Sequence, residues 1–171
     1  MQSKKYRRLA MVINYLALDR PDLQFAAGVL GRTAAKPTER SWANLKRAGR
    51  YLVKHPKVVF LYRPCEVEEA LQLFTFGDSD WAGCKSSRRS VSGGAAVLGG
   101  GLLKGWSNRQ VTVALSSAEA EFYASTKAAV ETLGIESLMN DLGWKLQGKT
   151  VLTDSNAGAM ASRRGLGGLG I

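Results

Sequence analysis

The sequence has little of what zinc modules, membrane proteins and secreted proteins require. It contains two cysteines, Cys65 and Cys84, and one histidine, His55, among 171 residues. Because these residues form no CxxC pair, a recognisable zinc module is excluded, and both thiols are expected to be free. No apolar run approaches the length of a membrane span, and no signal-peptide pattern follows the basic start. An intracellular protein without a membrane partner is therefore expected.

Acidic residues are also few relative to basic ones. There are 14 Asp and Glu and 24 Lys and Arg, which gives a formal net charge of +10. The excess lies mainly in the N-terminal third, an asymmetry that favours a polyanionic partner. Nucleic acid is preferred to a membrane surface because no helix here combines cations with a strong Trp/Phe face. A surface that is basic only for solubility is the alternative, and charge alone does not decide between the two.

Length and apolar content predict one ordinary domain with a helical extension. Apolar residues make up 45% of the chain, which suffices for a packed interior. Residues 1–63 lack strand alternation and predict helices separated by Pro21 and Pro37. Residues 64–171 differ, because short apolar runs there are broken by glycine. The sequence thus predicts a boundary at residue 63.

The helix expected after Pro37 has a basic edge. Arg47, Arg50 and Lys54 follow one another at intervals of three and four residues, which places them along one side of a helix. One interpretation is a strip that contacts the phosphates of a nucleic-acid substrate. An ordinary solvated face is the other.

Four short strands are expected in the second region. They lie at residues 71–76, 91–98, 102–106 and 150–153, with the glycines at 99–101 as a hairpin turn. The third and fourth strands are separated by a long segment of helical character. This order predicts an α/β fold.

The long helix has clear start and stop signals. Ser116 and Glu119 form a capping-box pattern at its beginning, and the helix is expected to run toward Leu142, with Gly143 as its stop. A further short helix is expected at 156–163. The glycines that follow match GxGxxG, but a phosphate cradle needs a strand before the glycines and a helix after them. A flexible tail is therefore expected there, and no dinucleotide site.

Acidic residues occur where the predicted strands and the long helix begin or end. Asp78 and Asp80 follow the first strand, and Asp154 follows the fourth. Glu121 lies in the first turns of the long helix. Side chains at such ends can converge on one site, and carboxylate oxygens are ligands suited to magnesium or manganese.

Helical periodicity separates Glu121 from Glu119. Glu121 shares one side of the helix with an apolar stripe, while Glu119 points almost oppositely and serves the capping box. The stripe comprises Ala124, Ala128, Ile135, Leu138, Met139 and Leu142. A carboxylate that faces the sheet is costly unless a cation or hydrogen bonds compensate it, so metal ligation would explain Glu121. An exposed position near the helix end is the alternative.

Four motifs occur in order at residues 76–83 (FGDSDWAG), 89–94 (RSVSGG), 113–122 (VALSSAEAEF) and 153–156 (TDSN). Together they resemble the ribonuclease H domain of copia-type long-terminal-repeat retrotransposons. The upstream strings DRPDLQFA and WANLKRAGRYL resemble the segment that connects the reverse-transcriptase core to this nuclease in the same Pol polyproteins. The resemblance implies a helical connection segment at 1–63. It implies a ribonuclease H-like mixed sheet flanked by helices at 64–171.

The resemblance also implies an activity, the hydrolysis of the RNA strand of RNA/DNA hybrids during reverse transcription. The reaction would use two magnesium or manganese ions. Asp78, Glu121 and Asp154 match the first three acids of the family. Asp80 competes for the first role and is expected to take a supporting position near the metal or in the turn.

Further expectations concern the substrate and the end of the chain. Ser155 and Asn156 are expected either to contact backbone or 2′-hydroxyl groups of the substrate or to cap the following helix. The resemblance implies a fourth acid, in C-terminal elements that the 171 residues do not contain. A catalytically dead remnant that only binds nucleic acid, or is only structural, is therefore the alternative function. An upstream reverse-transcriptase domain is the expected protein partner.

Overall fold

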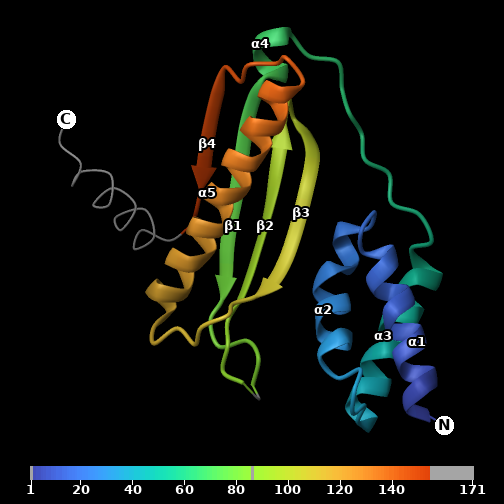
Figure 1. The fold of residues 1–171 in the computed structure, drawn as a ribbon. Coiled ribbons are helices and arrows are strands. Elements are labelled where there is room, and N and C mark those ends of the chain that lie inside the picture. The colour runs from blue at the N-terminus through green and yellow to red at the C-terminus, as the bar shows by residue number, and fades with distance from the viewer. Residues whose placement is uncertain (1, 86, 155–171) are drawn as a thin grey trace. The chain divides into compact units, whose positions relative to one another are not determined.

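The computed structural model describes residues 2–85 and 87–154, and the chain divides into two compact units, Met1–Val59 and Phe60–Ile171. Figure 1 shows helices in the first unit and a sheet with helices in the second. Each unit has its own cluster of buried apolar side chains. The two are therefore described separately, as the helical unit and the sheet unit.

The helical unit consists of α1 (Gln2–Leu16), the 3-10 helix η1 (Pro21–Leu23), α2 (Gln24–Arg32) and α3 (Glu39–Lys54). Its core is built from side chains at helical spacing, which turn the apolar side of each helix inward. The buried members are Tyr6, Ala10, Ile13, Ala17, Leu23, Ala27, Leu30, Leu45 and Ala48. The prediction of helices separated by the two prolines is confirmed.

Hydrogen bonds from side chains stabilise both ends of α3. The Thr38 hydroxyl accepts a hydrogen bond from the Ser41 amide at 3.3 Å, which caps the first turn. At the other end the Arg20 guanidinium donates to the carbonyl oxygen of His55 at 3.1 Å and also pairs with Asp22 at 2.8 Å. The hydrogen bond from Arg20 holds the pKa of Asp22 below its usual value.

The sheet unit contains a short helix α4 (Val67–Ala70), four strands and one long helix. The strands are β1 (Gln72–Asp80), β2 (Val91–Leu98), β3 (Gly101–Arg109) and β4 (Gly148–Leu152), and α5 (Ser117–Asp141) lies between β3 and β4. Their spatial order is β3-β2-β1-β4, with β4 parallel to β1 and the other pairs antiparallel. The predicted α/β fold with a mixed sheet is confirmed. The expected helix at 156–163 and the glycine tail lie outside the described residues.

Small residues let α5 pack closely on the sheet (Figure 1). A Cβ atom at Gly77 would lie 3.0 Å from the Ala128 Cβ and 3.1 Å from the Ala124 carbonyl oxygen. The Thr132 hydroxyl donates to the Thr75 hydroxyl at 2.8 Å across the same interface. The buried face of α5 is therefore Ala120, Ala124, Ala128, Thr132 and Ile135. The expectation that the stripe would continue through Leu138 and Leu142 is wrong, because both side chains are more than half exposed.

The expected turn and cap residues are largely as predicted. Gly99 and Gly100 both have positive φ, which suits the tight connection between β2 and β3. The Ser116 hydroxyl accepts from the Glu119 amide at 3.2 Å. The Glu119 carboxylate, however, accepts from the Leu115 amide at 2.7 Å, one residue before the capping residue. Among the described residues, no helix combines the length and apolar content that crossing a bilayer requires.

Candidate metal centre

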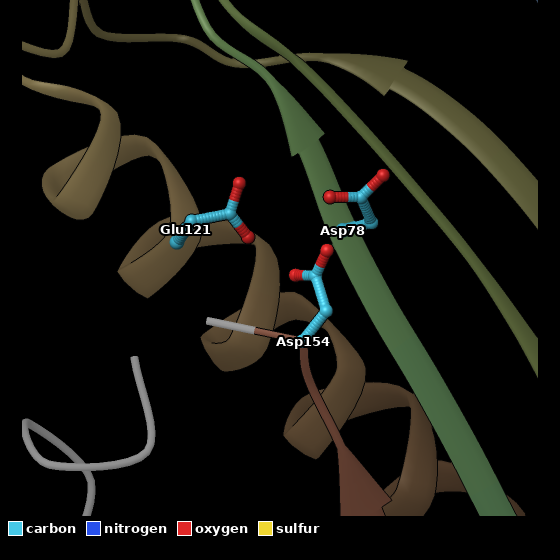
Figure 2. A group of neighbouring side chains, drawn as sticks. All are labelled: Asp78, Glu121 and Asp154. Atoms are coloured by element: carbon cyan, nitrogen blue, oxygen red, sulfur yellow. The ribbon is translucent and has the colours of Figure 1, made fainter. Parts of the chain in front are cut away.

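The topology of the sheet unit brings three chain segments together at one end. β1 and β4 run parallel, so both finish at the same edge of the sheet, and α5 begins there. Asp78 lies near the end of β1, Asp154 follows β4 by two residues, and Glu121 lies in the second turn of α5. One carboxylate oxygen from each of these residues lies within 4.8 Å of the other two. Figure 2 shows the three carboxylates pointing toward one another.

Ser79 touches two of these three residues. Its hydroxyl donates to Glu121 Oε1 at 2.6 Å, and its backbone amide donates to Asp78 Oδ1 at 2.7 Å. Because side chains alternate along a strand, Ser79 faces α5, whereas Asp78 lies on the other face of the sheet. The Ser79 bonds therefore link one carboxylate on each side of β1.

The second oxygen of Glu121 has no partner in the described part of the chain. Glu121 Oε2 is buried and accepts no hydrogen bond there. Leaving a buried polar oxygen without a hydrogen bond costs roughly 2–7 kcal/mol even for an uncharged group, and more for an ionised carboxylate. Two further carboxylates lie beside it and add like-charge repulsion. A divalent cation with oxygen ligands would satisfy the oxygen and neutralise the charge, so the residues present fit magnesium or manganese.

A hollow of about 650 Å³ opens beside the carboxylates, on the face of the sheet turned away from α5. Asp78 and Asp154 line it, together with small or apolar residues from β1, β2 and β4. These are Phe76, Gly77, Gly93, Gly94, Ala95, Leu152 and Thr153. Another hollow, of about 430 Å³, lies in the helical unit between α2 and α3 and is mostly apolar. It contains one acid, Asp22, so it is not the candidate metal centre.

The other predicted site residues are placed differently. Asp80 ends β1, and its carboxylate lies over Gly83, where any side chain would collide with it. The group of three described carboxylates does not include Asp80, so its supporting role stays a prediction. Ser155 and Asn156 lie outside the described residues.

The basic strip is on the helical unit. Arg47, Arg50 and Lys54 are all exposed on α3. The sequence did not predict a role for Ser79. Its position between Asp78 and Asp80 at the end of a strand could have indicated that it lies close to the carboxylates.

Pol polyproteins of transposons are among the proteins that the chain resembles. The retrovirus-related Pol polyprotein from transposon RE2 of Arabidopsis thaliana is 34% identical over 156 residues, 91% of this chain. That from transposon TNT 1-94 of Nicotiana tabacum is 29% identical over 147 residues, 86% of this chain. The chain belongs to the Pol polyproteins of copia-type retrotransposons.

This Pol chain spans about a tenth of the length of those Pol relatives, 10% for RE2 and 11% for TNT 1-94. Smaller relatives are covered more fully. The secreted RxLR effector protein 161 of Plasmopara viticola is 37% identical over 134 residues, which are 78% of this Pol chain and 92% of that protein. No family model matches the chain. No solved structure matches it either.

Proposed function

We propose that the sheet unit is a ribonuclease H-like nuclease that hydrolyses the RNA strand of RNA/DNA hybrids during retroelement reverse transcription. The observation that carries this proposal is the convergence of Asp78, Glu121 and Asp154, whose oxygens lie within 4.8 Å of one another. A second observation is the buried Glu121 Oε2, which accepts no hydrogen bond in the described part of the chain. The element order, three antiparallel strands followed by a helix and a parallel strand, supports the ribonuclease H-like fold.

Asp78, Glu121 and Asp154 would bind the cations from different sides of the site. When bound, magnesium or manganese would supply an activated water and charge neutralisation at the leaving 3′ oxygen. Asp78 and Asp154 would hold the cations from the open side, where the hollow admits a sugar-phosphate backbone. Glu121 would hold them from the side of α5, through its unpaired Oε2. Gly93 and Ala95 leave the floor of the hollow low enough for a close approach of the substrate.

The helical unit would hold the substrate. Arg47, Arg50 and Lys54 form an exposed line of cations suited to the phosphates of the hybrid. An upstream reverse-transcriptase domain as partner, and action inside the cell, belong to the same proposal.

The test is cleavage of an RNA/DNA hybrid by the full chain with magnesium or manganese. We expect Asp78→Asn and Asp154→Asn each to lower the rate by at least about 100-fold, since even partners of metal ligands are worth 10–100-fold. Asp141→Asn, which removes a carboxylate at the other end of α5, is the matched control and should cleave normally. Equal cleavage by all three variants would refute the assigned roles.

A second function is favoured by the charge of the helical unit, namely binding of nucleic acid without cleavage. Such a module would show no cleavage with either metal. Its affinity for the hybrid would still fall linearly with the logarithm of salt concentration. Affinity that is independent of salt would exclude it.

A further inference from the structure

Ser79 makes the only hydrogen bond to the Glu121 carboxylate found among the described residues. The bond joins Ser79 Oγ to Oε1 at 2.6 Å, a short distance typical of hydroxyl donors to ionised oxygens. The other oxygen, Oε2, is buried and unpaired. One oxygen of Glu121 is therefore committed to the protein, and the other is left for a ligand.

We infer that Ser79 is a positioning residue that orients Glu121 for metal binding. The inference rests on the proposed metal site. Without the hydroxyl, the Glu121 carboxylate would be free to rotate or to swing away from Asp78 and Asp154, because three negative groups within 4.8 Å repel one another. The Ser79 hydroxyl holds Glu121 against this repulsion before any cation arrives.

The backbone that carries Glu121 is fixed independently of Ser79. Gln110 is buried, and its Nε2 donates to the Ala120 carbonyl oxygen and to the Ser92 hydroxyl, both at 2.9 Å. These bonds tie the first turns of α5 to β2. Loss of the Ser79 hydroxyl should therefore release the side chain of Glu121 while the helix stays in place.

The chemistry can be isolated with two variants of nearly equal shape. Ser79→Thr keeps the hydroxyl, whereas Ser79→Val replaces it with a methyl group, and both β-branched residues suit a strand. The measurement is the affinity of the full chain for Mn²⁺ alone, by calorimetric titration without nucleic acid. We expect Ser79→Thr to bind Mn²⁺ like the wild type and Ser79→Val to bind about 10–100-fold more weakly. Ser137→Val, at an exposed site on α5, should leave the affinity unchanged.

Each outcome decides the inference. Equal Mn²⁺ affinity for the Val and Thr variants overturns it, because shape and not the hydroxyl would then matter. Absence of Mn²⁺ binding by the wild type also overturns it. A wild type that binds Mn²⁺ but does not cleave the hybrid refutes the proposed nuclease and leaves the role of Ser79 standing. Far-ultraviolet circular dichroism of every variant shows whether the fold is retained.

Discussion

The helical unit and the sheet unit differ sharply in charge. Residues 1–59 contain 13 Lys and Arg and 3 Asp and Glu, whereas residues 60–171 contain 11 of each kind. The entire formal excess of +10 thus belongs to the helical unit. All three grouped carboxylates belong to the sheet unit. The net positive charge and the candidate metal ligands therefore lie in different units.

Under the proposed function, the charge of the helical unit would raise the local concentration of a polyanionic substrate. The carboxylates of the sheet unit would bind the cation. Net charge and the candidate metal ligands thus reside in different units of the chain.

The largest effect is expected from removing the basic strip. Replacing Arg47, Arg50 and Lys54 together with Gln should lower hybrid affinity by about two orders of magnitude near 0.1 M salt. It should also reduce the slope of log affinity against log salt by roughly 2.7, because each phosphate contact contributes about 0.9. Fluorescence anisotropy across a salt series measures both quantities.

A control with the same charge change separates the strip from the net charge. Lys4, Arg7 and Arg8 are exposed on α1, and their joint replacement with Gln also removes three cations from the helical unit. We expect a much smaller loss of affinity. Equal losses would mean that the unit acts through its total charge and that α3 has no special role.

The next effect concerns packing of the sheet unit. A side chain at Gly94 would collide with the Trp106 ring and with the Phe76 carbonyl oxygen. Gly94→Ala should lower the free energy of unfolding by about 3 kcal/mol, the upper part of the usual range for overpacking. Gly93→Ala is the control, since its nearest contact would be the Trp106 carbonyl oxygen at 4.0 Å.

Hydrogen exchange resolved by peptide gives the measurement for the glycine pair. Because each unit has its own core, protection should fall in β1, β2 and β3 and stay unchanged in α1. Loss of protection in both units alike would contradict the view that they are separate cores.

A smaller effect is expected from Gln110. Gln110→Met keeps a similar length but removes the donors to the Ser92 hydroxyl and the Ala120 carbonyl oxygen. The free energy of unfolding should fall by about 2 kcal/mol, the cost of buried polar groups left unpaired. Denaturant titration measures it. Asn108→Ala, at an exposed site on β3, should change stability little.

The smallest effect is a pH dependence at Glu131. Burial alone would raise the pKa of Glu131, but Lys104 and Lys127, at 2.5 and 2.6 Å, lower it below the usual value. A lowered pKa in the folded state gives stability above the usual pKa of a glutamate, and this stability is lost as the pH falls through the lowered pKa. Glu131→Gln should therefore be less stable than the wild type at pH 7, by under about 1 kcal/mol, and equal to it in acid. Thermal melting at several pH values tests this, and a constant difference at every pH would contradict it.

The sequence predicted the bounds of a helix or strand well where the residues next to those bounds determine them. The strand predicted at residues 91–98 has the same bounds in the structure, because serine and glycine residues flank it in the sequence. The first strand was expected to end at residue 76, but β1 continues to Asp80. The strand continues through Gly77, which lies where α5 approaches β1 closely. That approach depends on tertiary packing, which local sequence does not contain.

The candidate site was predicted in part for the same reason. Asp78, Glu121 and Asp154 follow from element ends and from resemblance, and the structure brings them together. The hydrogen bond from Ser79 to Glu121 depends on the distance between α5 and β1. Helical and strand periodicity do not predict that distance. The exposure of Leu138 and Leu142 likewise depends on tertiary packing, which helical periodicity does not contain.

The crossover from β1 through α5 to the parallel strand β4 also affects how the site is made. Its three acids are contributed by residues 78, 121 and 154, so no single hairpin contains them. Parallel pairing requires the whole intervening chain, and such non-local contacts form slowly. A nascent polypeptide that has emerged only through α5 carries two of the three acids. Cation affinity should therefore arise only after β4 has been synthesised and has docked beside β1.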